Sequence, residues 1–118
     1  LEASAFWWGG CRSAAPQLEA WYQQYKDQGF IVMTLIGETN SGGSPTQDDL
    51  QEWANDYGLT HPVLADPGFG ELVNYLYADP NFSGSFGLPN MELLSPGMQV
   101  EIINGYVSAS DIEAYLPE

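Results

Sequence analysis

Cys11 is the only cysteine of this chain, and its thiolate would be the strongest nucleophile available to it. A thiolate can attack a disulfide, but a buried thiol with a raised pKa is inert and behaves as a small apolar residue. One cysteine forms no intrachain disulfide, and Cys11 and His61 alone cannot complete a tetrahedral zinc site. We therefore expect neither a metal nor a cofactor. His61, which precedes a proline, is expected to make a local hydrogen bond.

The residues before Cys11 give the thiol an unusual setting. Trp7 and Trp8 are followed by Gly9 and Gly10, and the thiol comes next. The glycines allow the backbone to approach a partner closely. If a helix starts here, the positive potential of its N-terminus stabilises a thiolate.

Hydrophobic periodicity indicates the elements that position these residues. A short strand is expected within residues 1–8, and a helix after Arg12, where apolar residues recur at spacings of three and four until Gly29. Residues 30–36 form a continuous β-rich run, which is typical of a central strand buried on both faces. A capping box formed by Thr46 and Asp49 predicts the start of a second helix.

The second half of the chain predicts shorter elements. They are a second interior strand (62–65), a weak helix (69–77) and a loop (79–90). Two antiparallel strands (91–94 and 98–103) joined by a Pro-Gly turn follow, and Ser110 and Glu113 start a closing helix (110–116). This order predicts an α/β fold with a mixed sheet of about five strands and helices on both faces. At 118 residues, the chain is expected to form a single domain, residues 1–118.

The order of elements resembles the thioredoxin fold, and the motifs are similar to those of the TlpA-like and AhpC/TSA-like thiol–disulfide oxidoreductases. That family carries W-C-x-x-C-R-x-x-x-P at the start of a helix, and this chain reads Trp7-Trp8-Gly9-Gly10-Cys11-Arg12-Ser13-Ala14-Ala15-Pro16. Further matches follow along essentially the whole chain, at residues 29–30, 53–59, 62–66, 87–89 and 93–97. The usual N-terminal extension of the family is expected to be absent.

The resemblance implies that Trp8 stands where the family has its nucleophilic cysteine, and that Cys11 is the resolving cysteine. An indole cannot attack a disulfide, so the chain as written cannot run the two-cysteine cycle. Three explanations stay open. Trp8 is native and the domain is redox-silent, or it is an engineered or artefactual replacement, or it stands for a selenocysteine, because the UGA codon differs from the Trp codon UGG by one base.

The resemblance also implies that Pro89 is a cis-proline that faces the start of the first helix. The backbone before such a proline can pair with an extended peptide. Trp7, Trp8, Leu88 and Pro89 would then form an apolar patch that binds peptide without chemistry, and Gly9 and Gly10 would give a peptide backbone room to approach.

Two classes of function follow from this site. The first is a thiol–disulfide oxidoreductase domain whose residue 8 is natively cysteine or selenocysteine. The second is a redox-silent thioredoxin-like module that binds peptides or proteins. A single-cysteine peroxidase acting through Cys11 is less well supported, because Trp8 replaces the hydroxyl residue that such a mechanism needs.

Composition limits the partners of the protein. The chain has sixteen acidic residues and only two basic ones, Arg12 and Lys26, for a net charge of −14. This charge excludes nucleic acid and acidic membranes as default partners, and most Asp and Glu are expected on a solvated surface. No apolar run reaches the ~20 residues of a membrane span. We expect protein thiols, disulfides or extended peptides as partners, and Cys11 could link two copies through a disulfide.

TlpA-like relatives work outside the cytoplasm. The acidic composition and the first residue, Leu1 rather than Met, agree with such a location. The resemblance thus predicts a periplasmic, secreted or membrane-anchored protein, with any anchor outside this chain.

Overall fold

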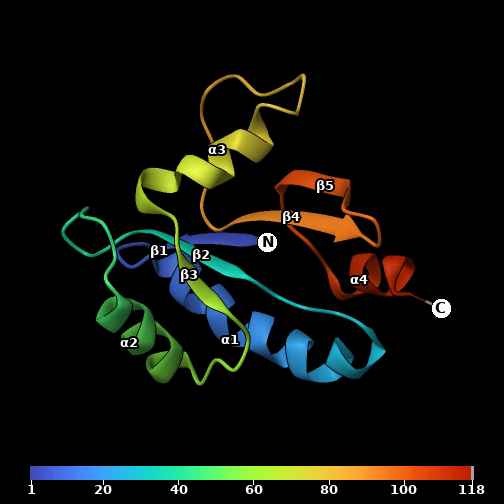
Figure 1. The fold of residues 1–118 in the computed structure, drawn as a ribbon, viewed down its shortest axis with the longest axis horizontal. Coiled ribbons are helices and arrows are strands. Elements are labelled where there is room, and N and C mark those ends of the chain that lie inside the picture. The colour runs from blue at the N-terminus through green and yellow to red at the C-terminus, as the bar shows by residue number, and fades with distance from the viewer. Residues whose placement is uncertain (118) are drawn as a thin grey trace.

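A five-stranded mixed sheet forms the centre of the molecule in the computed structural model, which describes residues 1–117 (Figure 1). The strands are β1 (Glu2–Ala5), β2 (Thr34–Glu38), β3 (Val63–Ala65), β4 (Asn90–Ser95) and β5 (Gln99–Gly105). Their order in the sheet is β3-β2-β1-β4-β5. β1, β2 and β3 run parallel, whereas β4 is antiparallel to β1 and β5 is antiparallel to β4. The predicted α/β fold with a mixed sheet is confirmed.

The helices cover both faces of this sheet, as Figure 1 shows. α1 (Gly9–Tyr25) and α2 (Gln47–Tyr57) pack on one face, where Ala15 and Trp53 share an apolar cluster with β2. α3 (Gly70–Leu76) packs on the other face, against β1 and β5. The closing helix α4 (Ala109–Tyr115) lies beside α1, to which it is joined by a hydrogen bond from the Tyr25 hydroxyl to Glu113. Two short 3₁₀ helices, η1 (Lys26–Gln28) and η2 (Pro67–Phe69), follow α1 and precede α3.

β1 is the most deeply buried strand, and its two faces differ in chemistry. All four of its residues are buried. Because side chains alternate along a strand, Ala3 and Ala5 face α3, and their small size lets that helix pack closely. Glu2 and Ser4 face α1. A polar face is therefore enclosed between the central strand and the first helix.

Several predicted elements differ from the observed ones in their bounds or in their place in the sheet. α1 begins at Gly9 and not after Arg12, because the carbonyl of Trp8 already accepts hydrogen bonds from the amides of Cys11 and Arg12. The predicted central strand over residues 30–36 is displaced to Thr34–Glu38, and Ile31 is 52% exposed. The strand predicted to be interior near residues 62–65 lies at the edge of the sheet as β3.

The caps of two helices show how local sequence sets helix starts. The predicted capping box of α2 is confirmed: the Thr46 side chain accepts from the Asp49 amide, and Asp49 accepts from the Thr46 amide. For α4 the prediction was two residues late. Ser108 and Asp111 form its capping box, which places Ser110 inside the helix.

Candidate functional site

Cys11 lies in the first turn of α1 and has no exposed surface. Its Sγ accepts a hydrogen bond from the amide of Ala5 at 3.5 Å. Burial raises the pKa of the Cys11 thiol, and the Ala5 and Ser4 hydrogen bonds and the charge of Arg12 offset this only in part. The thiol is thus protonated and shielded in this conformation. A disulfide between two copies would require it to move to the surface.

Trp7 and Trp8 form an exposed aromatic pair at the start of α1. They are 44% and 47% exposed, and their rings meet edge to face at 6.0 Å. The Trp7 indole Nε1 donates to a Glu38 carboxylate oxygen at 2.8 Å, which ties it to the end of β2. Trp8 makes no side-chain cap at the start of the helix. An apolar, solvent-facing ring therefore occupies the place where the resemblance puts the nucleophile.

The loop before β4 packs against this helix start, where Pro89 lies next to Gly10. The Leu88–Pro89 peptide bond is cis. A Cβ added at Gly10 would lie 3.4 Å from Pro89 Cδ and only 2.9 Å from the indole Nε1 of Trp8. Gly10 is thus packed between the proline and the tryptophan, while Gly9 has only Arg12 nearby.

Of the predicted apolar patch, only part lies at the surface. Pro89 is buried, and Leu88 is half-buried and packs against both sides of the core. Trp7 and Trp8 supply its exposed apolar surface, with the exposed backbone of Gly9 and Gly10 beside them.

A buried carboxyl group behind Cys11 was missed by the sequence analysis. Glu2 is 2% exposed, contrary to the expectation that acidic residues are solvated. It accepts a hydrogen bond from the Ser4 hydroxyl, and Ser4 lies beside Cys11 and lowers the pKa of its thiol. Burial raises the pKa of Glu2 to about 7, although hydrogen bonds from Ser4 and Thr34 lower it. The signal in the sequence was a glutamate and a serine at alternate positions of one short strand.

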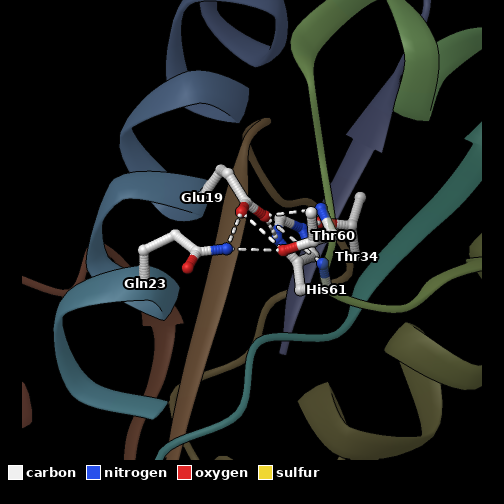
Figure 2. A network of polar contacts seen from close by, with 5 residues as sticks. All are labelled: Glu19, Gln23, Thr34, Thr60 and His61. Carbon is white, nitrogen blue, oxygen red and sulfur yellow. Dashed lines mark hydrogen bonds and ion pairs between the residues drawn. The ribbon is translucent and has the colours of Figure 1, made fainter.

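A second buried polar group lies farther along α1 and contains His61 (Figure 2). The His61 Nδ1 lies 3.0 Å from Glu19 Oε1, and its Nε2 lies 3.0 Å from Thr34 Oγ1. Glu19 also accepts from the side chain of Gln23 and from the amide and hydroxyl of Thr60, each at 2.7 Å. The local hydrogen bond expected for His61 is thus part of a long-range network that joins α1, β2 and the loop before β3.

The charges of this network follow from its contacts. Burial alone would raise the pKa of Glu19, but hydrogen bonds from Gln23, Thr60 and His61 outweigh it and lower the pKa to about 2. Burial lowers the pKa of His61, and the neighbouring Glu19 opposes this effect. Glu19 is therefore an ionised carboxylate that accepts hydrogen bonds from several donors, and His61 is mostly neutral at neutral pH.

Within residues 1–117, the structure shows no helix that is long and apolar enough to cross a membrane. In the same described part of the chain, no three His, Cys, Asp or Glu side chains are grouped so that they could hold a metal ion.

Comparison with known proteins agrees with the class of fold. No family model matches the chain. A stretch of 50 residues is 42% identical to the glutathione peroxidase-like peroxiredoxin gpx1 of Schizosaccharomyces pombe. The match covers 41% of this chain and 32% of that protein, so it spans about a third of the relative. Together with the five-stranded mixed sheet, this similarity defines the fold as thioredoxin-like.

Proposed function

We propose that this is a thioredoxin-like domain of the thiol–disulfide oxidoreductase class, similar to TlpA, in which position 8 is the place of the attacking group. The observation that carries the proposal is the position of Cys11. Its thiol is buried in the first turn of α1, three residues after Trp8, and is backed by the carboxyl of Glu2. This is where a resolving thiol has to be.

The chemistry assigned to this site has two steps when residue 8 is a cysteine. Its thiolate attacks a disulfide of a partner protein, forms a mixed disulfide and releases one partner thiolate. Cys11, as thiolate, then attacks the sulfur of residue 8, which releases the second partner thiolate and leaves a disulfide between residues 8 and 11. Residues three apart on a helix are neighbours, so the two sulfur atoms can meet.

The second step needs Cys11 to lose its proton, and Glu2 is placed to take it. The Ser4 hydroxyl donates to the Glu2 carboxyl and lies beside the thiol, so it is the one group through which the proton would pass. A carboxyl with a pKa of about 7 is matched to this transfer near neutral pH. Glu2 and Cys11 therefore serve the same step.

A redox-silent binding module is the second candidate, and the exposed tryptophans favour it. With Trp8 in place the attack cannot occur, yet Trp7 and Trp8 offer a partly exposed aromatic surface beside the accessible backbone of Gly9 and Gly10. An extended peptide segment fits the chemistry of such a surface. A peroxidase that acts through Cys11 is disfavoured, because its thiol is buried and its pKa is raised.

The Trp8→Cys variant tests the proposal. We expect no insulin reduction by the chain with Trp8, and measurable reduction by Trp8→Cys, because the introduced thiol sits at a helix N-terminus that lowers its pKa. Under oxidising conditions the folded variant should titrate no free thiols.

Trp8→Ser is the matched control, since it removes the ring without adding a thiol, and it should stay inactive. Trp8→Cys combined with Cys11→Ser should stop at the mixed disulfide. If Trp8→Cys folds, titrates two free thiols and leaves insulin intact, the oxidoreductase assignment is wrong and the binding module takes its place. Sequencing the native codon for position 8 then tells whether tryptophan, cysteine or selenocysteine is the natural residue.

A further inference from the structure

Trp7 and Trp8 form an aromatic corner that faces solvent at the start of α1. Their rings are inclined at 69° with centroids 6.0 Å apart, and both side chains are nearly half exposed. The other two tryptophans differ, because Trp53 is buried and Trp21 is half-buried. An exposed pair of indole rings is uncommon on a soluble domain, and it marks a place where a partner binds.

Both rings of the aromatic corner are held by the edge that carries the indole nitrogen. Trp7 Nε1 donates to a carboxylate oxygen of Glu38 at 2.8 Å. The same edge of Trp8 lies against Gly10, since a Cβ added at Gly10 would be 2.9 Å from Trp8 Nε1. Because contacts fix the rings before a partner arrives, little side-chain freedom is lost on binding.

The carboxylate of Glu38 gives the aromatic corner a negative character. Glu38 is half-buried at the end of β2, and within residues 1–117 the one ion pair joins Glu19 to His61, so Glu38 has no cationic partner there. The face of an indole ring carries negative potential, and a carboxylate that accepts from the indole N–H increases the electron density of the ring. The ring faces and the carboxylate therefore attract the same kind of group, a cation.

The two basic side chains of the chain leave these ring faces open. Lys26 lies over the ring of Tyr22, with its Nζ 5.9 Å from the ring centroid. Arg12 Nη1 donates to the carbonyl of Phe6 at 3.0 Å. In the part of the chain that the structure describes, neither cation lies over a ring of the aromatic corner. A cation that binds there has to come from another molecule.

Acidic side chains extend the negative surface beyond the aromatic corner. Asp49 and Glu52 line an open hollow together with Phe6 and Thr39. Phe6 and Thr39 are direct chain neighbours of the tryptophan pair and of its carboxylate partner, so the hollow adjoins the corner. Arg12 is the one nearby charge that opposes a cation, and the carboxylates outnumber it. The net charge of −14 attracts a cationic partner over longer distances as well.

We propose that the aromatic corner and Glu38 bind a lysine or arginine side chain from an extended basic segment of a partner protein. The cation stacks on the ring faces, the peptide chain lies along the exposed backbone of Gly9 and Gly10, and the acidic hollow receives a second basic residue. The extended peptide rests on the binding module of the proposed function. The cation site depends on no reaction of Cys11.

Binding is measured on the chain as it stands, with Trp8 in place, by fluorescence anisotropy of a labelled Gly-Ser peptide that carries two lysines. The same peptide with norleucine at both positions is the neutral control, because norleucine keeps the apolar stem of lysine and lacks the ammonium group. We expect the lysine peptide to bind, and NaCl to weaken its binding by screening the charges. Equal binding of the two peptides, or no binding of the lysine peptide, would overturn the proposal.

Two variants locate the cation site. Trp8→Leu keeps an apolar side chain and removes the ring face, and Glu38→Gln keeps an acceptor for the Trp7 indole and removes the charge. Each should weaken binding of the lysine peptide about two- to fivefold, as expected of an exposed cation–π contact or ion pair. An affinity that is unchanged in Trp8→Leu contradicts the stacking of the cation on the rings. If Trp8→Leu fails to fold, Glu38→Gln decides in its place, because both rings remain.

The matched controls lie at the opposite end of α1. Tyr115→Leu removes an exposed ring of α4, which contacts the last turn of α1, and Asp27→Asn removes an exposed carboxylate from η1. Both should leave the affinity for the lysine peptide unchanged. An equal loss in Asp27→Asn and Glu38→Gln would show that net charge alone attracts the peptide, and the assignment of Glu38 would be wrong.

Tetramethylammonium chloride distinguishes a peptide site from a site for a free small cation. We expect this salt to compete with the lysine peptide only at much higher concentration, because it makes no contact with the glycine backbone or the acidic hollow. If it binds as tightly as the peptide, the occupant is a small cation and the peptide assignment is wrong.

Insulin reduction by Trp8→Cys separates this inference from the oxidoreductase assignment. An active Trp8→Cys together with no binding of the lysine peptide by the parent contradicts the cation site alone. An inactive Trp8→Cys together with binding that depends on Trp8 and Glu38 supports the cation site and contradicts the oxidoreductase assignment alone.

Discussion

Glu2 is enclosed between β1 and α1, and its side chain shows how burial changes the behaviour of a single residue. Its carboxyl has a hydroxyl partner and a raised pKa, and it stands behind a thiol that is also buried. Glu19 is less deeply buried, at 9% exposed, and five hydrogen bonds to it lower its pKa instead. The same type of side chain thus holds a proton in one place and a permanent charge in the other.

The raised pKa of Glu2 predicts a pH-dependent stability. The folded-state pKa, about 7, lies above the ordinary value of 4.5, so the folded chain holds this proton more tightly than the unfolded chain does. At alkaline pH the ionised form costs roughly 3 kcal/mol of folding free energy, and the cost disappears as the pH falls through 7 toward 4.5.

Glu2→Gln removes that cost, because the amide cannot ionise. We expect its free energy of unfolding, measured by urea denaturation, to exceed that of the parent at pH 8 by about 1–3 kcal/mol. The gap should shrink by pH 5. A gap of the same size at both pH values would contradict the burial of an ionisable group at this position.

At the scale of elements, the start of α2 was predicted correctly, whereas the place of the central strand was not. The α2 capping box could be read from two residues three apart, because it is a local interaction. Which strand lies at the centre is decided by pairing across the sheet. Residues 30–36 look more strand-like than β1 does, yet β1 takes the central place, and Ile31 and Met33 are exposed.

α4 gives a direct test of which serine is the cap. Ser108→Ala should lower the free energy of unfolding by about 1 kcal/mol, since it removes the hydroxyl that accepts a hydrogen bond from the Asp111 amide. Ser110→Ala is the matched control and should have no destabilising effect, because alanine is a better helix former than serine. Urea denaturation of the two variants measures the difference, and equal losses would show that the cap is misplaced.

The candidate site was predictable only where a motif marked it. Trp8, Cys11 and Pro89 were found because they stand in a resemblance that fixes their spacing. The network of Glu19 and His61 was not, since it joins residues 42 positions apart. Such contacts depend on the register of β2 and on the packing of α1, and neither is visible in a linear pattern.

For the whole molecule, charge is the dominant surface property. Sixteen acidic side chains with two basic ones repel one another in the compact state, and this repulsion is screened by salt. We expect the free energy of unfolding at pH 7 to rise between 10 and 500 mM NaCl, measured by urea denaturation. At pH 4, where many carboxylates are protonated, the rise should be smaller. KCl should act like NaCl, and a loss of stability with either salt would contradict the repulsion.

The central place of β1 also has a consequence for how the chain acquires its shape. Glu2 and Ala3 pair with Met91 and Asn90, so about three quarters of the polypeptide lies between β1 and its antiparallel neighbour β4. During synthesis the innermost strand leaves the ribosome before its antiparallel neighbour has been made. Contacts between such distant segments slow folding and leave an unpaired edge exposed meanwhile. We therefore expect the sheet to be completed only after the hairpin of β4 and β5 has been made.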